Sequence, residues 1–183
     1  MKKDYTIRDL RFEDGPDLIN AYFSYYKELE SGNAELGLVL FKKKPGYESE
    51  VSWFAETYKG VLRGDRIAKV AEVGGKAVGL CEISKSRPGS ETDHIGALGI
   101  AIMDGYRDMG IGTALISAAL ADGRARFEAV KLTVFTTNKR AITVYKKMGF
   151  VELCTIPKAI KRGSRYFDEF LMYLDFGKIK RLR

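Results

Sequence analysis

The sequence has little of what marks several common protein classes. Among its 183 residues are two cysteines, one histidine and four prolines. Cys81 and Cys154 are too few for a disulfide framework and lack metal-ligand spacing, so we interpret both as reduced, buried side chains and expect no metal. No run approaches the ~20 apolar residues that span a bilayer. The charged N-terminal residues 1–5 precede no apolar run, so we expect no secretory signal.

These absences predict a cytoplasmic protein with no membrane partner. The length predicts one domain, residues 1–183, around one core. The formal charge of +7 suits an anionic ligand, a nucleic acid, or no more than solubility. Two basic clusters, at 158–165 and 178–183, lack the interleaved aromatic residues of a nucleic-acid platform. We therefore expect no nucleic-acid partner.

Hydrophobic periodicity and turn residues predict an alternation of strands and helices. A Gly-Gly pair joins two apolar runs at 74–75, a hairpin signal, and Gly149 suits the end of a helix. We expect strands at 5–8, 67–73, 77–84, 94–103, 130–134, 150–156 and 165–175, and helices at 14–26, 50–62, 110–126 and 138–149. The order β-α-α-β-β-β-α-β-α-β-β predicts an α/β fold with a mixed sheet and helices on both faces.

The most informative segment leads from a strand at 100–103 through a glycine-rich turn into a helix. Gly110 and Gly112 let backbone N–H groups approach an anion at the helix start, where the helix dipole favours negative charge. Arg107 could add a charge-assisted contact. The spacing matches neither a P-loop nor the dinucleotide fingerprint, so it predicts a diphosphate site of another kind. Close packing of the two glycines is the alternative interpretation.

Arg107-Asp108-Met109-Gly110-Ile111-Gly112 resembles the R/Q-x-x-G-x-G/A signature of the GNAT superfamily of N-acetyltransferases. The run from Asn138 to Phe150 resembles the family's N-x-x-A-x-x-x-Y-x-x-x-G-F motif. Segments 98–102 and 166–172 resemble its central and last strands. The resemblance implies a GNAT-like, mainly antiparallel sheet and transfer of acetyl from acetyl-CoA to a primary amine in a ternary complex. It assigns cofactor binding to Ile100, Ala101, Ile102, Arg107, Asp108, Met109, Gly110, Ile111, Gly112, Thr113, Asn138 and Tyr145.

In the family, the tyrosine of the second motif protonates the departing thiolate, so the resemblance implies this catalytic role for Tyr145. Core packing is the alternative for Tyr145, and a helix cap is the alternative for Asn138. The positions that match the family's glutamates hold Gly96 and Thr133, which cannot accept a proton. His94 is therefore a candidate base or proton relay, and a structural hydrogen-bonding role is the alternative. Further candidates are Asp93, Glu82 and Glu72.

The sequence leaves the acceptor open among a small-molecule amine, a polyamine and a protein N-terminus. Aromatic side chains of the first two helices either line an acceptor cleft or pack in the core: Tyr22, Tyr25, Tyr26, Trp53 and Phe54. The basic segment 157–165 is expected in the last hairpin turn. A regulatory module that binds acetyl-CoA without turnover is the alternative function. The oligomeric state is also open, a homodimer being the commonest assembly.

Overall fold

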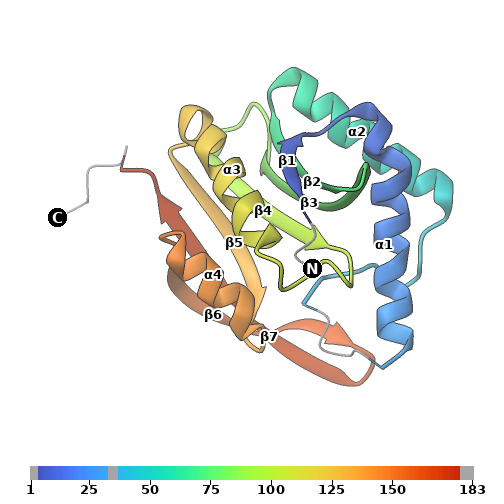
Figure 1. Cartoon of the computed structure of the whole chain (residues 1–183). Helices are drawn as coiled ribbons and strands as arrows, with labels where there is room; N and C mark the ends of the chain where they lie inside the picture. Colours follow the sequence, from blue (N-terminus) through green and yellow to red (C-terminus); the bar gives the residue numbers. More distant parts are fainter. Residues whose placement is uncertain (1–3, 33–36, 178–183) are drawn as a thin grey trace.

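The computed structural model describes residues 4–32 and 37–177. Within this part of the chain, seven strands form one sheet in the order β1-β2-β3-β4-β5-β7-β6 (Figure 1). The β4–β5 pair is parallel and the others are antiparallel. The strands are β1 (Thr6–Asp9), β2 (Arg66–Val73), β3 (Lys76–Lys85), β4 (Ile95–Ile102), β5 (Ala129–Phe135), β6 (Val151–Arg162) and β7 (Arg165–Asp175). The helices are α1 (Gly15–Glu30), α2 (Tyr47–Arg63), α3 (Ile111–Arg126) and α4 (Lys139–Lys147), with a 3-10 turn at Phe12–Asp14.

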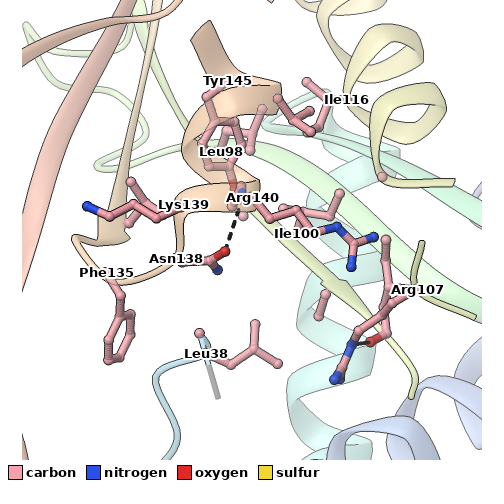
Figure 2. A pocket seen from close by; sticks show the side chains of 18 of the residues that line it. Leu38, Leu98, Ile100, Arg107, Ile116, Phe135, Asn138, Lys139, Arg140 and Tyr145 are labelled. Carbon is pink, nitrogen blue, oxygen red and sulfur yellow. Dashed lines mark hydrogen bonds between the residues drawn. The ribbon is translucent and has the colours of Figure 1, made fainter. Parts of the chain in front are cut away.

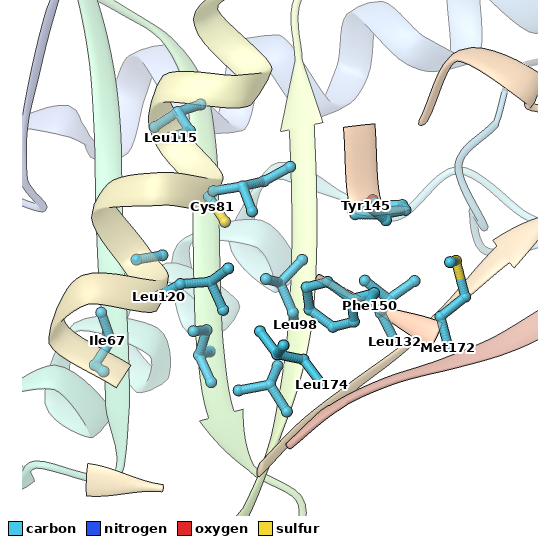
Figure 3. Packing of buried hydrophobic residues seen from close by; sticks show 14 of the residues in the cluster. Ile67, Cys81, Leu98, Leu115, Leu120, Leu132, Tyr145, Phe150, Met172 and Leu174 are labelled. Carbon is cyan, nitrogen blue, oxygen red and sulfur yellow. The ribbon is translucent and has the colours of Figure 1, made fainter. Parts of the chain in front are cut away.

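Helices cover both faces of this sheet, which confirms the predicted fold class. On one face, α3 buries side chains at i, i+4 and i+8, namely Ile111, Leu115 and Ala119, because this spacing aligns them along one stripe of the helix. They join Tyr145 of α4 and the central strands in one hydrophobic cluster (Figure 3). On the opposite face, Leu18 of α1 and other apolar side chains form a second cluster. The sheet therefore separates two cores.

The last hairpin differs from the prediction made for it. Strand β6 continues to Arg162, so the basic segment expected in a turn is mostly extended and pairs with β7. The pairing shifts register between Ile156 and Ile160, and the Lys158 N–H within this bulge donates to the Asp168 carboxylate at 2.7 Å. Pairing with β7 thus overrides the weak strand propensity of the Lys- and Arg-containing segment.

Two further predictions need correction. Cys81 is fully buried, but Cys154 is exposed because it lies on β6 at the edge of the sheet. Helix α2 begins at Tyr47, three residues before the predicted start. The predicted hairpin between β2 and β3 is confirmed, with both Gly74 and Gly75 at positive φ.

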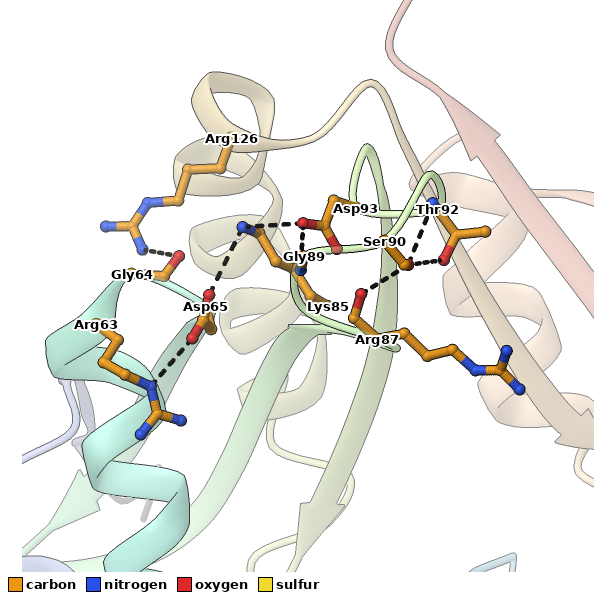
Figure 4. Close-up of polar contacts among 10 residues, drawn as sticks. All are labelled: Arg63, Gly64, Asp65, Lys85, Arg87, Gly89, Ser90, Thr92, Asp93 and Arg126. Atoms are coloured by element: carbon orange, nitrogen blue, oxygen red, sulfur yellow. Dashed lines mark hydrogen bonds and ion pairs between the residues drawn. The ribbon is translucent and has the colours of Figure 1, made fainter.

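Polar contacts fix the turn that leads into β4 (Figure 4). The Asp93 carboxylate accepts the Gly89 N–H at 2.7 Å, and Lys85 Nζ lies 3.7 Å from the same carboxylate and 3.6 Å from that of Asp65. The other Asp93 oxygen is buried without a hydrogen-bond partner. The turn also carries His94, whose carbonyl accepts the Glu128 N–H at 2.8 Å. These contacts define the N-terminal end of β4.

Candidate functional site

The two parallel central strands separate partway along their length. Strand β4 pairs with β5 through Ile95–Ala97 only, whereas β5 stays paired with β7 through Phe135. A cavity of about 910 Å³ opens beyond the last β4–β5 pair. Leu98–Ile102 of β4 line one side and Thr133–Phe135 of β5 line the other. The separation of the strands thus creates this cavity.

The backbone of β4 offers hydrogen-bonding groups to this cavity. Met103 N–H donates to the Val78 carbonyl of β3 at 2.9 Å, which sets the phase of the antiparallel ladder. Because alternate residues turn their N–H and C=O groups to opposite sides of a strand, those of Ile100 face away from β3. The Ile102 carbonyl also faces away, and it accepts Arg107 Nε at 2.9 Å. Ile100 is therefore left to pair with a ligand.

Helix α3 presents unpaired amides to the same cavity. The residue that caps it, Gly110, has φ +83°, and the first intrahelical bond runs from Ala114 N–H to the Gly110 carbonyl at 3.1 Å. The N–H groups of the first three helical residues, 111–113, consequently have no helical acceptor. No side chain caps this end and no acidic residue lies in the first turn. The end of α3 is therefore suited to an anion.

The Arg107 side chain lines the cavity but does not point at the start of α3. Its guanidinium makes two hydrogen bonds to the Glu28 carboxylate of α1, at 2.7 and 2.8 Å. This carboxylate raises the pKa of Arg107, although burial opposes the effect. With its bond to the Ile102 carbonyl, Arg107 ties the turn after β4 to α1 (Figure 2). The structure therefore gives Arg107 a positioning contact, and its contact with a diphosphate stays a prediction.

The other residues of the signature turn divide between cavity and core. Asp108, Gly110, Gly112 and Thr113 line the cavity. Met109 and Ile111 pack into the hydrophobic cluster under α3, so only their backbone can serve the site. Asp108, with φ 65°, forms an ion pair with Arg140 of α4 across the cavity mouth.

Helix α4 brings Asn138 and Tyr145 to the cavity wall, as their spacing predicts (Figure 2). Asn138 Oδ1 accepts the Ala141 N–H at 3.1 Å, so this side chain caps α4, and its Nδ2 atom has no hydrogen-bond partner among the described residues. Tyr145 is 6% exposed and packs against Phe150, with ring centroids 5.8 Å apart. Burial raises its pKa. Among the described residues its hydroxyl has no hydrogen-bond partner.

His94 lies apart from these groups. It precedes β4, whereas the cavity begins at Leu98, and it is not among the cavity-lining residues. Glu169 of β7 does line the cavity, 7% exposed, although the sequence did not single it out. The available signal was its position two residues after the buried Phe167, on the inward side of the strand. His94 and the cavity thus lie toward opposite ends of β4.

A second, smaller cavity of about 240 Å³ lies under α1 and α2. It shares four residues with the larger cavity, namely Leu38, Gly99, Ile100 and Ala101. Its other walls come from Leu18, Ala21, Tyr22, Tyr25, Trp53, Gly79, Leu80 and Glu82. Of the five aromatic residues that the sequence singled out, Tyr22, Tyr25 and Trp53 therefore line this cavity, whereas Tyr26 and Phe54 line neither cavity; Tyr25, Tyr26 and Phe54 are all buried.

Within residues 4–32 and 37–177, no helix is long and apolar enough to cross a membrane, and no group of side chains is arranged to hold a metal ion.

Comparison of the sequence with known proteins identifies a family and several relatives. Residues 23–150 match the model of the acetyltransferase (GNAT) family. The chain is 30% identical over 154 residues to an uncharacterized N-acetyltransferase of Methanocaldococcus jannaschii, with 82% of this chain and 62% of that protein aligned. It is 33% identical over 106 residues to the L-amino acid N-acetyltransferase AaaT of Escherichia coli, with 56% and 64% aligned. The chain thus spans less than two thirds of these relatives.

Solved structures share the fold. The acetyltransferase yncA of Salmonella typhimurium, determined with acetyl-CoA, superposes with a TM-score of 0.80 at 15% identity over 98% of both chains. A phosphinothricin acetyltransferase of Sinorhizobium meliloti in complex with acetyl-CoA gives 0.80 at 18% identity, over 100% of this chain and 93% of that one. A GNAT-family acetyltransferase of Streptococcus pneumoniae gives 0.73 at 25% identity, over 95% of this chain and all of the other.

Proposed function

The chain belongs to the GNAT family of acetyltransferases, and from this premise we propose that it transfers an acetyl group from acetyl-CoA to a primary amine by direct attack. One observation carries the proposal. Two cavities lie on opposite faces of β4 and share Gly99, Ile100 and Ala101. A thioester in the larger cavity and an amine in the smaller one would therefore meet at the same three residues.

The larger cavity fits acetyl-CoA in three respects. The unpaired N–H groups of 111–113 suit its diphosphate. The outward C=O group of Ile100 suits an amide N–H of its pantetheine arm, which would lie along β4 as another strand does. The volume of about 910 Å³ lies within the ~300–1,000 Å³ usual for ligand sites. Bound there, acetyl-CoA supplies the activated acetyl group.

Residues of this chain would perform three tasks in the transfer. The Ile100 N–H would donate to the acetyl oxygen as negative charge develops on it. As the amine nitrogen bonds to the acetyl carbon and the C–S bond breaks, the Tyr145 hydroxyl would protonate the departing sulfur, since burial raises its pKa and keeps it protonated at neutral pH. The protons that the amine loses would pass to water, from which Tyr145 would be protonated again. The side-chain amide of Asn138 would hold the arm between them. Arg107 would fix the turn and β4 through Glu28 and the Ile102 carbonyl.

His94 is not carried into this proposal as the base, because it does not line either cavity. Gly96 and Thr133 supply no carboxylate at the positions that the family motif indicates. The acidic side chains that line the cavities are Glu82 in the smaller one and Asp108 and Glu169 in the larger one.

Calorimetric titration with acetyl-CoA, followed by a thiol-release assay with a panel of amines, tests the proposal. The panel should include small amines, amino acids, a polyamine and a peptide with a free N-terminus. We expect saturable binding and amine-dependent release of CoA thiol. Absence of both heat and thermal stabilisation at saturating acetyl-CoA would refute the proposal. Binding without thiol release for any acceptor would instead indicate the regulatory module without turnover.

A further inference from the structure

The smaller cavity identifies a class of acceptor, an inference that rests on the proposed function. It contacts β4 on the face toward α1 and α2, while the larger cavity opens toward β5 and α4. Both cavities include Gly99, where an added methyl group would meet only the Glu82 side chain, at 3.8 Å; we call this shared stretch of β4 the passage between the cavities. A ligand in the smaller cavity is therefore positioned to present one end to Ile100.

The walls of this cavity are apolar and aromatic. Tyr22 and Tyr25 of α1 lie on one side, and Trp53 of α2 contributes a third ring. Leu18, Ala21 and Leu80 complete the apolar lining. The volume of about 240 Å³ is below the ~300–1,000 Å³ of sites for drug-sized molecules. The occupant should therefore be compact and should carry an aliphatic or aromatic group.

A single charged side chain, Glu82, lines the cavity within the described part of the chain. Arg66 holds one of its carboxylate oxygens and also lies 3.4 Å from the Thr57 hydroxyl. The other oxygen, Oε1, has no partner among the described residues, and a methyl group built on Gly99 would lie 3.9 Å from it. Glu82 Oε1 is thus an unused hydrogen-bond acceptor that faces the passage between the cavities.

No lysine, arginine or histidine of the described ranges lines this cavity. Guanidinium groups contact lining residues only from outside the cavity: Arg66 pairs with Glu82, Arg107 lies over the Tyr25 ring, and Arg162 donates to the Leu38 carbonyl at 2.8 Å. A ligand carboxylate would be desolvated beside Glu82 without a lining counter-ion. An ammonium group would instead gain both a carboxylate and aromatic faces.

We propose that the acceptor is a compact primary amine with an apolar body and no carboxylate, and that Glu82 binds its ammonium group at the passage to Ile100. Tyr22, Tyr25 and Trp53 enclose the apolar body. Free amino acids are disfavoured because their carboxylate has no partner here. Long polyamines are disfavoured because a second ammonium would lie against apolar walls.

Matched acceptors that differ by one carboxylate test this specificity. Phenylethylamine and phenylalanine form one pair, and 3-methylbutylamine and leucine form another. We expect kcat/KM to be at least about 100-fold higher for the amine of each pair, since an unpaired buried carboxylate is costly. Equal or higher kcat/KM for the amino acid would overturn the inference, and so would failure of every compact amine to be acetylated.

The substitution Glu82→Gln tests the role of the carboxylate. We expect the KM for phenylethylamine to rise about 10-fold or more, while the affinity for acetyl-CoA stays unchanged. Glu72→Gln is the matched control, because Glu72 also pairs with an arginine, Arg8, on a neighbouring strand and has similar side-chain exposure, 27% against 23% for Glu82. An unchanged KM in Glu82→Gln would overturn the role assigned to Glu82.

A second variant guards against a loss of folding in the first. Leu80→Lys places a cation on the same wall and should shift the kcat/KM ratio toward phenylalanine, a gain that misfolding cannot mimic. An unchanged ratio in a folded Leu80→Lys protein would count against the charge argument. Calorimetry separates the two proposals: without acetyl-CoA binding the proposed function fails, whereas binding with an amino-acid preference contradicts only the acceptor class.

Discussion

Thr113→Glu should stabilise the free protein and weaken its binding of acetyl-CoA. Thr113 is the third residue of α3, is exposed and lines the larger cavity. A carboxylate in the first turn would face the unpaired amides and the positive end of the helix, which contributes about 0.3–1 kcal/mol. For a chain of this size, that corresponds to a rise in Tm of roughly 1–4 °C.

The same carboxylate would oppose a diphosphate bound to those amides. With two phosphate charges at about 6 Å in a dielectric near that of water, Coulomb repulsion amounts to about 1.4 kcal/mol. This is about a tenfold increase in Kd. Because the Debye length is about 10 Å at 0.1 M salt, the effect should diminish as salt is added.

Calorimetry and thermal unfolding measure the two effects on one sample. Thr113→Gln controls for side-chain shape without charge. Ser117→Glu places a carboxylate one turn further along α3, at an exposed position outside the cavity lining. If Thr113→Glu binds acetyl-CoA as tightly as both controls at low salt, the diphosphate does not lie at the start of α3, and the reasoning from its unpaired amides is wrong.

Three further substitutions probe the site, the buried charge and the packing. Tyr145→Phe should lower kcat about 100-fold or more with unchanged acetyl-CoA affinity, because the ring still packs but no proton can be donated; equal kcat values would exclude the proton donor role. Glu50 is 4% exposed, and burial raises its pKa, so the stability it contributes below its unfolded pKa is lost as pH rises through the folded pKa. The Tm difference between Glu50→Gln and wild type should therefore grow in favour of the variant from pH 4 to pH 7, and a constant difference would contradict this. Gly96→Ala should cost about 1–3 kcal/mol of folding free energy, because the new methyl group would clash with Ile83. Gly99→Ala should cost less, because its methyl group would meet only ordinary contacts at 3.8 Å. Equal losses of stability in denaturant titrations of the two variants would refute the comparison.

Much of the fold could be predicted from the sequence because its signals are local. The i, i+4 spacing of Ile111 and Leu115 fixes the buried face of α3, and Gly74-Gly75 fixes a hairpin. The extension of β6 could not be predicted, because pairing with β7 decides it and its Lys- and Arg-containing residues carry no strand signal.

The site was predictable where two motifs lie close in sequence and not where contacts join distant elements. Asn138 and Tyr145 share a helix face by spacing alone. The hydrogen bond between Arg107 and Glu28 joins residues 79 positions apart, so the sequence could not predict it. That Glu82 lines a cavity while His94 lines neither likewise depends on the fold and could not be read from the sequence.

The placement of the thiols bears on how transfer proceeds. Cys81 is fully buried beneath α3, and burial raises the pKa of its thiol, which makes it a poor nucleophile at neutral pH. Cys154 is exposed on β6 and lines neither cavity. Neither cysteine is therefore placed to hold an acetyl group between two half-reactions. The two cavities already meet at Gly99, Ile100 and Ala101, so an amine and a thioester bound together need no such carrier, and this geometry favours direct transfer.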